Sequence, residues 1–179
     1  MARVISHIGD LASRGKDLSR ILGEICTVKP AWQPRSRVGE YVIGLHSGAP
    51  AQSDYRDWRF PTFVAGVHAM YFELWRVLSD TAHLDRAYLS LFRTAASGGE
   101  QELLALHCDP NEPDGAEHAV YKQGPHLHLA TSEVPGPHSH IALNRCHLEE
   151  VLKSRESFTR ALHLALIMLR DEVLGPLRD

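Results

Sequence analysis

The sequence is poor in cysteine and has no long hydrophobic run. Its 179 residues include three cysteines, Cys26, Cys108 and Cys146, and no two of them form a CxxC pair. An odd number of widely spaced thiols is typical neither of a disulfide framework nor of a zinc ribbon, and it fits a reducing compartment. The longest apolar stretch, Ala161–Leu169, is interrupted by His163. It is much shorter than the about 20 residues that cross a bilayer, so we expect no membrane segment.

The sequence also lacks an excess of positive charge. Its 19 Lys and Arg residues stand against 22 Asp and Glu residues, which gives a formal net charge of −3. Nucleic-acid binding depends on clustered Lys and Arg, so this balance disfavours a nucleic-acid partner, although it does not exclude a local basic site. Residues 1–18 carry charges throughout and have no continuous apolar region, which disfavours a secretory signal. We therefore expect a cytoplasmic protein.

The length favours a single α+β domain over residues 1–179. Apolar residues from Val4 to Ile25 alternate spacings of three and four, which predicts a helix over 3–26 that packs along another helix. This stripe is either part of the core or the seam of a homodimer, so residues 1–26 are also a candidate oligomerisation element. Gly15 lies within the stripe and predicts either a closely crossing helix or a break near residues 14–16.

The rest of the chain predicts an antiparallel sheet with helices on one face. Breakers in residues 27–61 indicate a connector with one short strand at Glu40–Leu45. Helical spacing predicts a helix over 62–80, and short apolar runs with turn signals predict a four-stranded meander over about 87–143. Two further helices are expected at 146–153 and 157–173, capped by Asn144 and Ser157.

Histidine is the abundant residue. Seven of the 12 histidines lie in one quarter of the chain: His107, His118, His126, His128, His138, His140 and His147. Within this region the segment Gly124–Ala130 is repeated twelve residues later as Gly136–Ala142. Both copies read GPHxH, then an aliphatic residue, then alanine. This duplication is the strongest signal in the sequence.

Strand periodicity places the duplicated histidines on one face. Alternate residues of a strand share a face, so His126 and His128 oppose their aliphatic neighbours, as do His138 and His140. A hairpin that keeps the aliphatic side chains together pairs His128 with His138 and His126 with His140. Directly opposed residues have Cβ atoms about 4.5–5.5 Å apart, close enough for imidazoles to converge on one ion. The sequence therefore predicts a four-histidine metal site.

Two residues are candidate catalytic groups beside that site. His118 is separated from His126 by an even number of positions, so it lies on the same face as the duplicated histidines if the strand continues back to it. Glu133, at the turn, is a candidate fourth ligand or general base. His107 or Cys108 can also face the histidines, and the sequence does not decide between them.

The spacing also permits a comparison with one family. His126-x-His128-x4-Glu133 resembles the first metal motif of cupins, and His140-x3-Asn144 resembles the end of their second. The two motifs nearly touch, the glycines typical of cupins are absent from the expected places, and we expect the surrounding chain to be largely helical, where a cupin needs many strands. The resemblance therefore implies shared ligand chemistry and no family membership.

Three functions fit this pattern. The first is a metal-dependent hydrolase with zinc as the expected ion, and iron, nickel, copper or manganese as alternatives. Its substrate is a small or phosphate-bearing molecule. The second function is a non-catalytic interaction module within an assembly, and the third is a metal-free, histidine-based enzyme that resembles a nuclease.

One set of side chains is either a wall that binds phosphate or carboxylate groups beside the site or a group of solvated surface residues: Arg35, Arg37, Arg56, Arg59, Tyr41, Tyr55 and Trp58.

Overall fold

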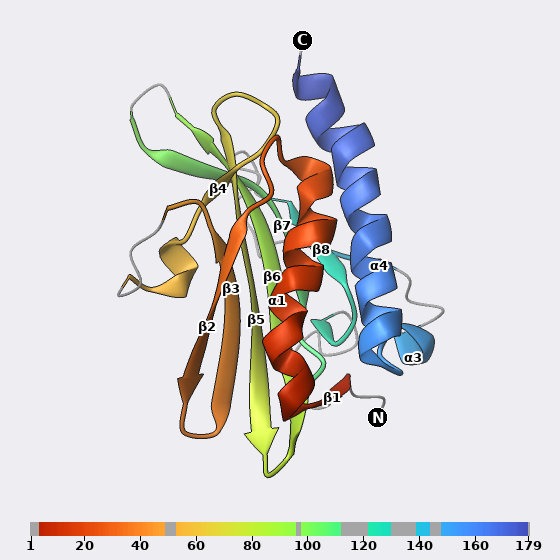
Figure 1. Ribbon diagram of the computed structural model, residues 1–179. Coiled ribbons are helices and arrows are strands. Elements are labelled where there is room, and N and C mark those ends of the chain that lie inside the picture. The colour runs from red at the N-terminus through yellow and green to blue at the C-terminus, as the bar shows by residue number, and fades with distance from the viewer. Residues whose placement is uncertain are drawn as a thin grey trace.

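The protein is an antiparallel sheet with helices on one face, as expected for the α+β class (Figure 1). A computed structural model describes residues 4–48, 53–95, 98–111, 122–129, 139–143 and 148–178. The strand order over these residues is β2 (Ala31–Arg37), β3 (Glu40–His46), β5 (Val67–Leu78), β6 (Thr81–Thr94), β7 (Glu100–Cys108), β8 (His126–Leu129) and β9 (Ser139–Ala142). Strand β1 (Ile5–His7) also pairs with β6, and β4 (Phe60–Pro61) also pairs with β5. The described part of the sheet thus has nine strands, and the expectation of a sheet limited to four strands over 87–143 is wrong.

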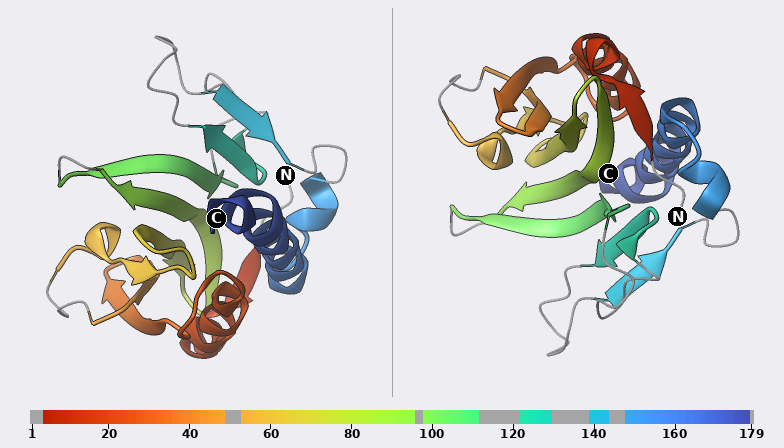
Figure 2. Two further views of the ribbon diagram at one scale, coloured as in Figure 1. Left: turned by 90° about the horizontal axis from the view of Figure 1, so that it is seen from above. Right: turned by 90° about the horizontal axis from the view of Figure 1, so that it is seen from below.

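The helical layer contains α1 (Ile8–Leu22) and α4 (Arg155–Met168). Both lie on the same face of the sheet (Figure 2). A 3-10 turn (Gly23–Ile25) extends α1, and a π-helical segment (Leu169–Leu174) with a final 3-10 turn (Gly175–Leu177) extends α4. Among the helices of the described residues, none is long and apolar enough to cross a membrane.

The helix boundaries differ from the expected ones at both ends of the chain. Residues Ile5–His7 form the short strand β1, and the His7 side chain caps α1 by accepting from the Gly9 N–H. Ser154, and not Ser157, caps α4, because its hydroxyl accepts from the Ser157 N–H at 3.1 Å. The helix expected at 146–153 is the single turn α3 (Leu148–Val151), and its predicted cap Asn144 lies outside the described residues.

The apolar stripe of α1 is buried inside the chain. Leu11, Leu18 and Leu22 are fully buried, so the intramolecular alternative accounts for the stripe and a homodimer through this helix stays a prediction. Helix α1 runs unbroken through Gly15, and the close neighbour there is the indole of Trp32. A Cβ at this position would lie 2.1 Å from Trp32 Cδ2, so both expectations for Gly15, a crossing helix and a break, are wrong.

The connector forms more regular structure than its prolines indicate. Strands β2 (Ala31–Arg37) and β3 (Glu40–His46) form a hairpin, which confirms the strand expected at 40–45 and adds one before it. Strand β2 can hold Pro34 because it is the edge of the sheet, where a missing N–H donor breaks no ladder. The turn between them includes Gly39 at φ 73°, which favours glycine.

The helix expected at 62–80 is wrong, because this segment is a central strand. Strand β5 (Val67–Leu78) lies between β3 and β6, with the short β4 (Phe60–Pro61) paired to its beginning. It is buried on both faces through Ala69–Trp75, so apolar residues occupy consecutive positions and imitate helical spacing.

A buried ion pair joins α1 to β5. The Arg14 guanidinium donates to both carboxylate oxygens of Glu73 at 3.0 and 2.7 Å, and each residue is at most 1% exposed. Tyr71 and Trp75 also donate to this carboxylate, at 2.8 and 3.1 Å. Burial alone would lower the pKa of Arg14, but the charge and hydrogen bonds of Glu73 outweigh it and raise the pKa above its usual value.

The remaining strands form an antiparallel meander. They are β6 (Thr81–Thr94), β7 (Glu100–Cys108), β8 (His126–Leu129) and β9 (Ser139–Ala142). Strand β6 begins six residues earlier than expected and pairs there with β1. Leu106 and Leu127 are opposed on neighbouring strands and pack against the core beneath the helices. The residues that alternate with them therefore lie on the sheet face turned away from the helices.

Candidate metal centre

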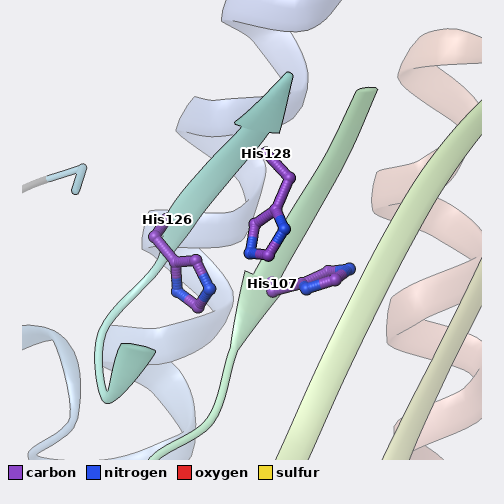
Figure 3. Close-up of side chains that lie close together, drawn as sticks. All are labelled: His107, His126 and His128. Atoms are coloured by element: carbon purple, nitrogen blue, oxygen red, sulfur yellow. The ribbon is translucent and has the colours of Figure 1, made fainter. Parts of the chain in front are cut away.

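Three histidines meet on the face of the sheet opposite the helices. Strand β7 supplies His107, and β8 supplies His126 and His128, which project toward it (Figure 3). His107 and His126 are directly opposed in the antiparallel register, and His128 lies two residues further along the same face. The spacing of two within β8 and the pairing between strands together make a triangle of imidazoles, which we call the histidine triad.

The three rings are close enough to share an ion. Each offers a nitrogen atom, and these atoms lie within 4.8 Å of one another. The ring centroids of His107 and His128 are 4.2 Å apart, those of His126 and His128 are 4.9 Å apart, and those of His107 and His126 are 5.8 Å apart. A tetrahedral zinc ion with bonds of about 2.0–2.1 Å would need nitrogens about 3.4 Å apart, so the side chains would have to move by about 1 Å to hold one.

His126 is buried and is held by a hydrogen bond to the backbone. It is 1% exposed, and its Nδ1 donates to the Gly124 carbonyl at 2.9 Å. In the neutral ring this bond puts the lone pair on Nε2, the tautomer that metal-binding histidines adopt when a carbonyl accepts from the other nitrogen. Pro125 directly precedes β8, and its carbonyl accepts from the Leu143 N–H at 2.8 Å. The first GPHxH copy therefore starts the strand and orients its first histidine.

The register decides between His107 and Cys108. His107 faces the triad, whereas Cys108 faces the helices and packs near Phe158 and Ala161. Burial raises the pKa of the Cys108 thiol well above its usual range, and the nearby carboxylates of Asp109 and Glu73 raise it further. The thiol is therefore protonated at neutral pH and turned away from the site. The sequence does not show which of these two residues faces the histidines, because the apolar run Leu103–Leu106 occupies both faces of β7.

Tyr88 supports His107 from β6. The two residues are paired across the strands, and their rings stack with centroids 3.9 Å apart and an interplanar angle of 15°. The Tyr88 hydroxyl donates to Asp109 Oδ1 at 2.8 Å, which fixes the position of the phenol ring. His107 is thus packed against a ring that is itself held in place. No pattern in the sequence singles out Tyr88.

The expected register of the duplicated hairpin is wrong by two residues. His128 pairs with His140, and His126 pairs with Ala142, in place of His128 with His138 and His126 with His140. A slip of two preserves which residues share a face, so the hydrophobic pattern cannot distinguish the two registers. His140 occupies the position opposite His128, and its role as a ligand stays a prediction.

The other predicted site residues are not tested by the structure. His118, Glu133 and His138 lie outside the described residues. The described part of the chain therefore brings together two of the four predicted metal ligands, His126 and His128, and adds His107.

The residues that form either a binding wall beside the site or a solvated surface group lie in two places. Arg37, Arg56 and Tyr55 line a cavity on the same face of the sheet as the triad. The Arg35 guanidinium instead lies 5.0 Å from the centre of the Trp58 ring, and Arg59 forms an ion pair with Glu100 at 3.2 Å. Trp58 is buried against Gly44, and Tyr41 packs against the core.

Comparisons with known proteins add no family. No known protein family, curated protein or solved structure matches the chain.

Proposed function

We propose that the protein is a metal-dependent hydrolase whose histidine triad binds a transition metal ion. The observation that carries this proposal is the convergence of three imidazole nitrogens within 4.8 Å on one face of the sheet. Three neutral imidazoles are a common ligand set for zinc, which is the first ion to test, with iron, nickel, copper and manganese as alternatives.

Hydrolysis is the chemistry that such a centre favours. Three protein ligands leave a fourth position for water, and a zinc ion lowers the pKa of that water to about 7. His107 and His128 are half-buried, so a substrate can approach the triad from their side. Glu133 and His118 stay candidates for proton transfer, and His138 and His140 stay candidates for further ligands.

Hydrolysis of p-nitrophenyl esters and phosphates by the zinc-loaded protein tests this function. His107→Phe keeps a ring against Tyr88 and removes the ligand nitrogen, so it should abolish zinc-dependent turnover while leaving the fold intact. His163→Ala, on α4 in the helical layer, is the matched control and should keep full activity. Turnover that His107→Phe leaves unchanged would reject the triad as the reaction centre.

A further inference from the structure

A cavity of about 410 Å³ lies beside the triad on the same face of the sheet. Four of its lining side chains are arginines, Arg37, Arg56, Arg76 and Arg86, and Glu40 is the acidic residue among those that line it. We call this cavity the arginine pocket. Its volume lies within the about 300–1,000 Å³ that is usual for pockets that bind small molecules.

The described ion pairs leave one of the four guanidinium groups of the pocket without a carboxylate partner. Arg76 pairs with Glu40 at 2.6 Å and with Asp85 at 3.5 Å, and Arg86 shares Asp85 at 3.4 Å.

Outside these pairs, the exposed Arg56 approaches Asp54 at 3.9 Å. Arg37 has no ion-pair partner among the residues that the structure describes. The described ion pairs thus join three of the four guanidinium groups to Glu40, Asp54 and Asp85, and Asp57 and Asp109 act on Arg56 and Arg86 from further away. Guanidinium groups bind phosphate and carboxylate oxygens through paired hydrogen bonds, so the pocket favours an oxyanion.

Aromatic rings form the floor of the pocket and lead to the triad. Phe72 of β5 contacts Tyr55 on one side and Tyr88 on the other, with centroid distances of 4.9 and 5.3 Å. The sheet register pairs Phe72 with Tyr88, Tyr88 with His107, and His107 with His126. A row of paired rings therefore crosses four strands, from the pocket floor at Phe72 to the triad.

We infer that the arginine pocket binds a small molecule that carries both an oxyanion and a flat ring, and that it presents this molecule to the triad. The arginines recognise the anionic group, and the aromatic floor contacts the ring. Tyr88 belongs to both places, because it lines the pocket and stacks on His107. This inference deepens the proposed function and rests on it for the role of the ligand as substrate, whereas binding of the ligand does not require the metal.

Calorimetric titration of the metal-free protein tests the pocket. Phenylphosphonate carries a ring and a phosphonate that water does not cleave readily, methylphosphonate lacks the ring, and benzamide lacks the charge. Phenylphosphonate should bind at least about tenfold more tightly than either partial probe, since each lacks one of the two contacts. Benzoate separates a carboxylate preference from a phosphonate preference. Tighter binding of benzamide than of phenylphosphonate would overturn the inference.

Two variants connect the binding to these residues. Arg86→Met keeps most of the side-chain length and removes the guanidinium, so it should weaken the binding of phenylphosphonate about tenfold. Arg160→Met makes the same change on α4, beside a groove in the helical layer, and should leave the affinity unchanged. Equal losses in both variants, or no loss in Arg86→Met, would overturn the inference.

The titration also separates failure of the pocket from failure of the metal centre. His126→Asn should retain phenylphosphonate binding in the absence of metal, because the triad does not hold the anion. Zinc binding without any binding of phenylphosphonate would reject the pocket and keep the metal centre. Binding that requires zinc and ignores Arg86→Met would also reject the pocket, because the anion would then sit on the metal.

Discussion

Replacement of Arg14 by leucine should destabilise the protein strongly. The substitution removes two of the four hydrogen bonds that Glu73 accepts and leaves its fully buried carboxylate beside the neutral donors Tyr71 and Trp75. Breaking one side of a buried ion pair costs about 3–5 kcal/mol, because the remaining charge has lost its compensation. For a domain of this length each kcal/mol lowers the Tm by about 2–4 °C. We therefore expect a decrease of about 6–20 °C.

A double variant distinguishes charge from packing. Arg14→Leu/Glu73→Leu removes both charges and should be more stable than Arg14→Leu alone, since no uncompensated carboxylate remains. Thermal unfolding followed by circular dichroism at pH 7 gives the three Tm values. A Tm for Arg14→Leu within about 2 °C of the unsubstituted protein, or a double variant less stable than the single one, would refute the reasoning.

Three further predictions follow from the packing and from the triad. Gly15→Ala should lower the free energy of unfolding by about 1–3 kcal/mol in urea titrations, because its Cβ would overlap the Trp32 ring, whereas alanine normally stabilises a helix. An unchanged or raised stability would contradict this packing. Cys108→Ala should leave zinc affinity unchanged, because its thiol faces the helices; a weakened affinity in calorimetry would make the thiol a ligand. Zinc affinity should fall at least about tenfold from pH 7.5 to pH 5.5, since protons compete for imidazole nitrogens, and a flat profile would argue against histidine ligands.

Period-two reasoning correctly predicted which histidines of β8 share a face of the sheet. The alternation of His126 and His128 with leucines predicted that both would leave the core face, and the structure places both in the triad. The same reasoning could not fix the register, because a slip of two residues leaves every side chain on the same face of the sheet. It also could not choose His107, since the apolar run before it covers both faces of β7. Contacts across strands, such as His107 with Tyr88, depend on pairings that no local pattern specifies.

The sequence predicts the fold class correctly, but it does not predict the full extent of the sheet. The stripe of α1 and the short strand Glu40–Leu45 follow from spacing alone. Strand β5 was misread because a strand buried on both faces loses the alternation that marks a strand. Strand β2 was missed because Pro34 reads as a breaker, although an edge strand tolerates it.

The number of zinc ions bound per chain tests the central claim most directly. The untagged protein is reconstituted with zinc, dialysed and measured by elemental analysis, together with His126→Asn and the control His163→Ala. Asparagine places an amide nitrogen near the position of Nδ1, so it can still donate to Gly124 while it lacks the ligand atom Nε2. We predict one zinc ion per chain in the unsubstituted protein and in His163→Ala, and none in His126→Asn. Full stoichiometry in His126→Asn, or no zinc in the unsubstituted protein, would contradict the histidine triad as a metal centre.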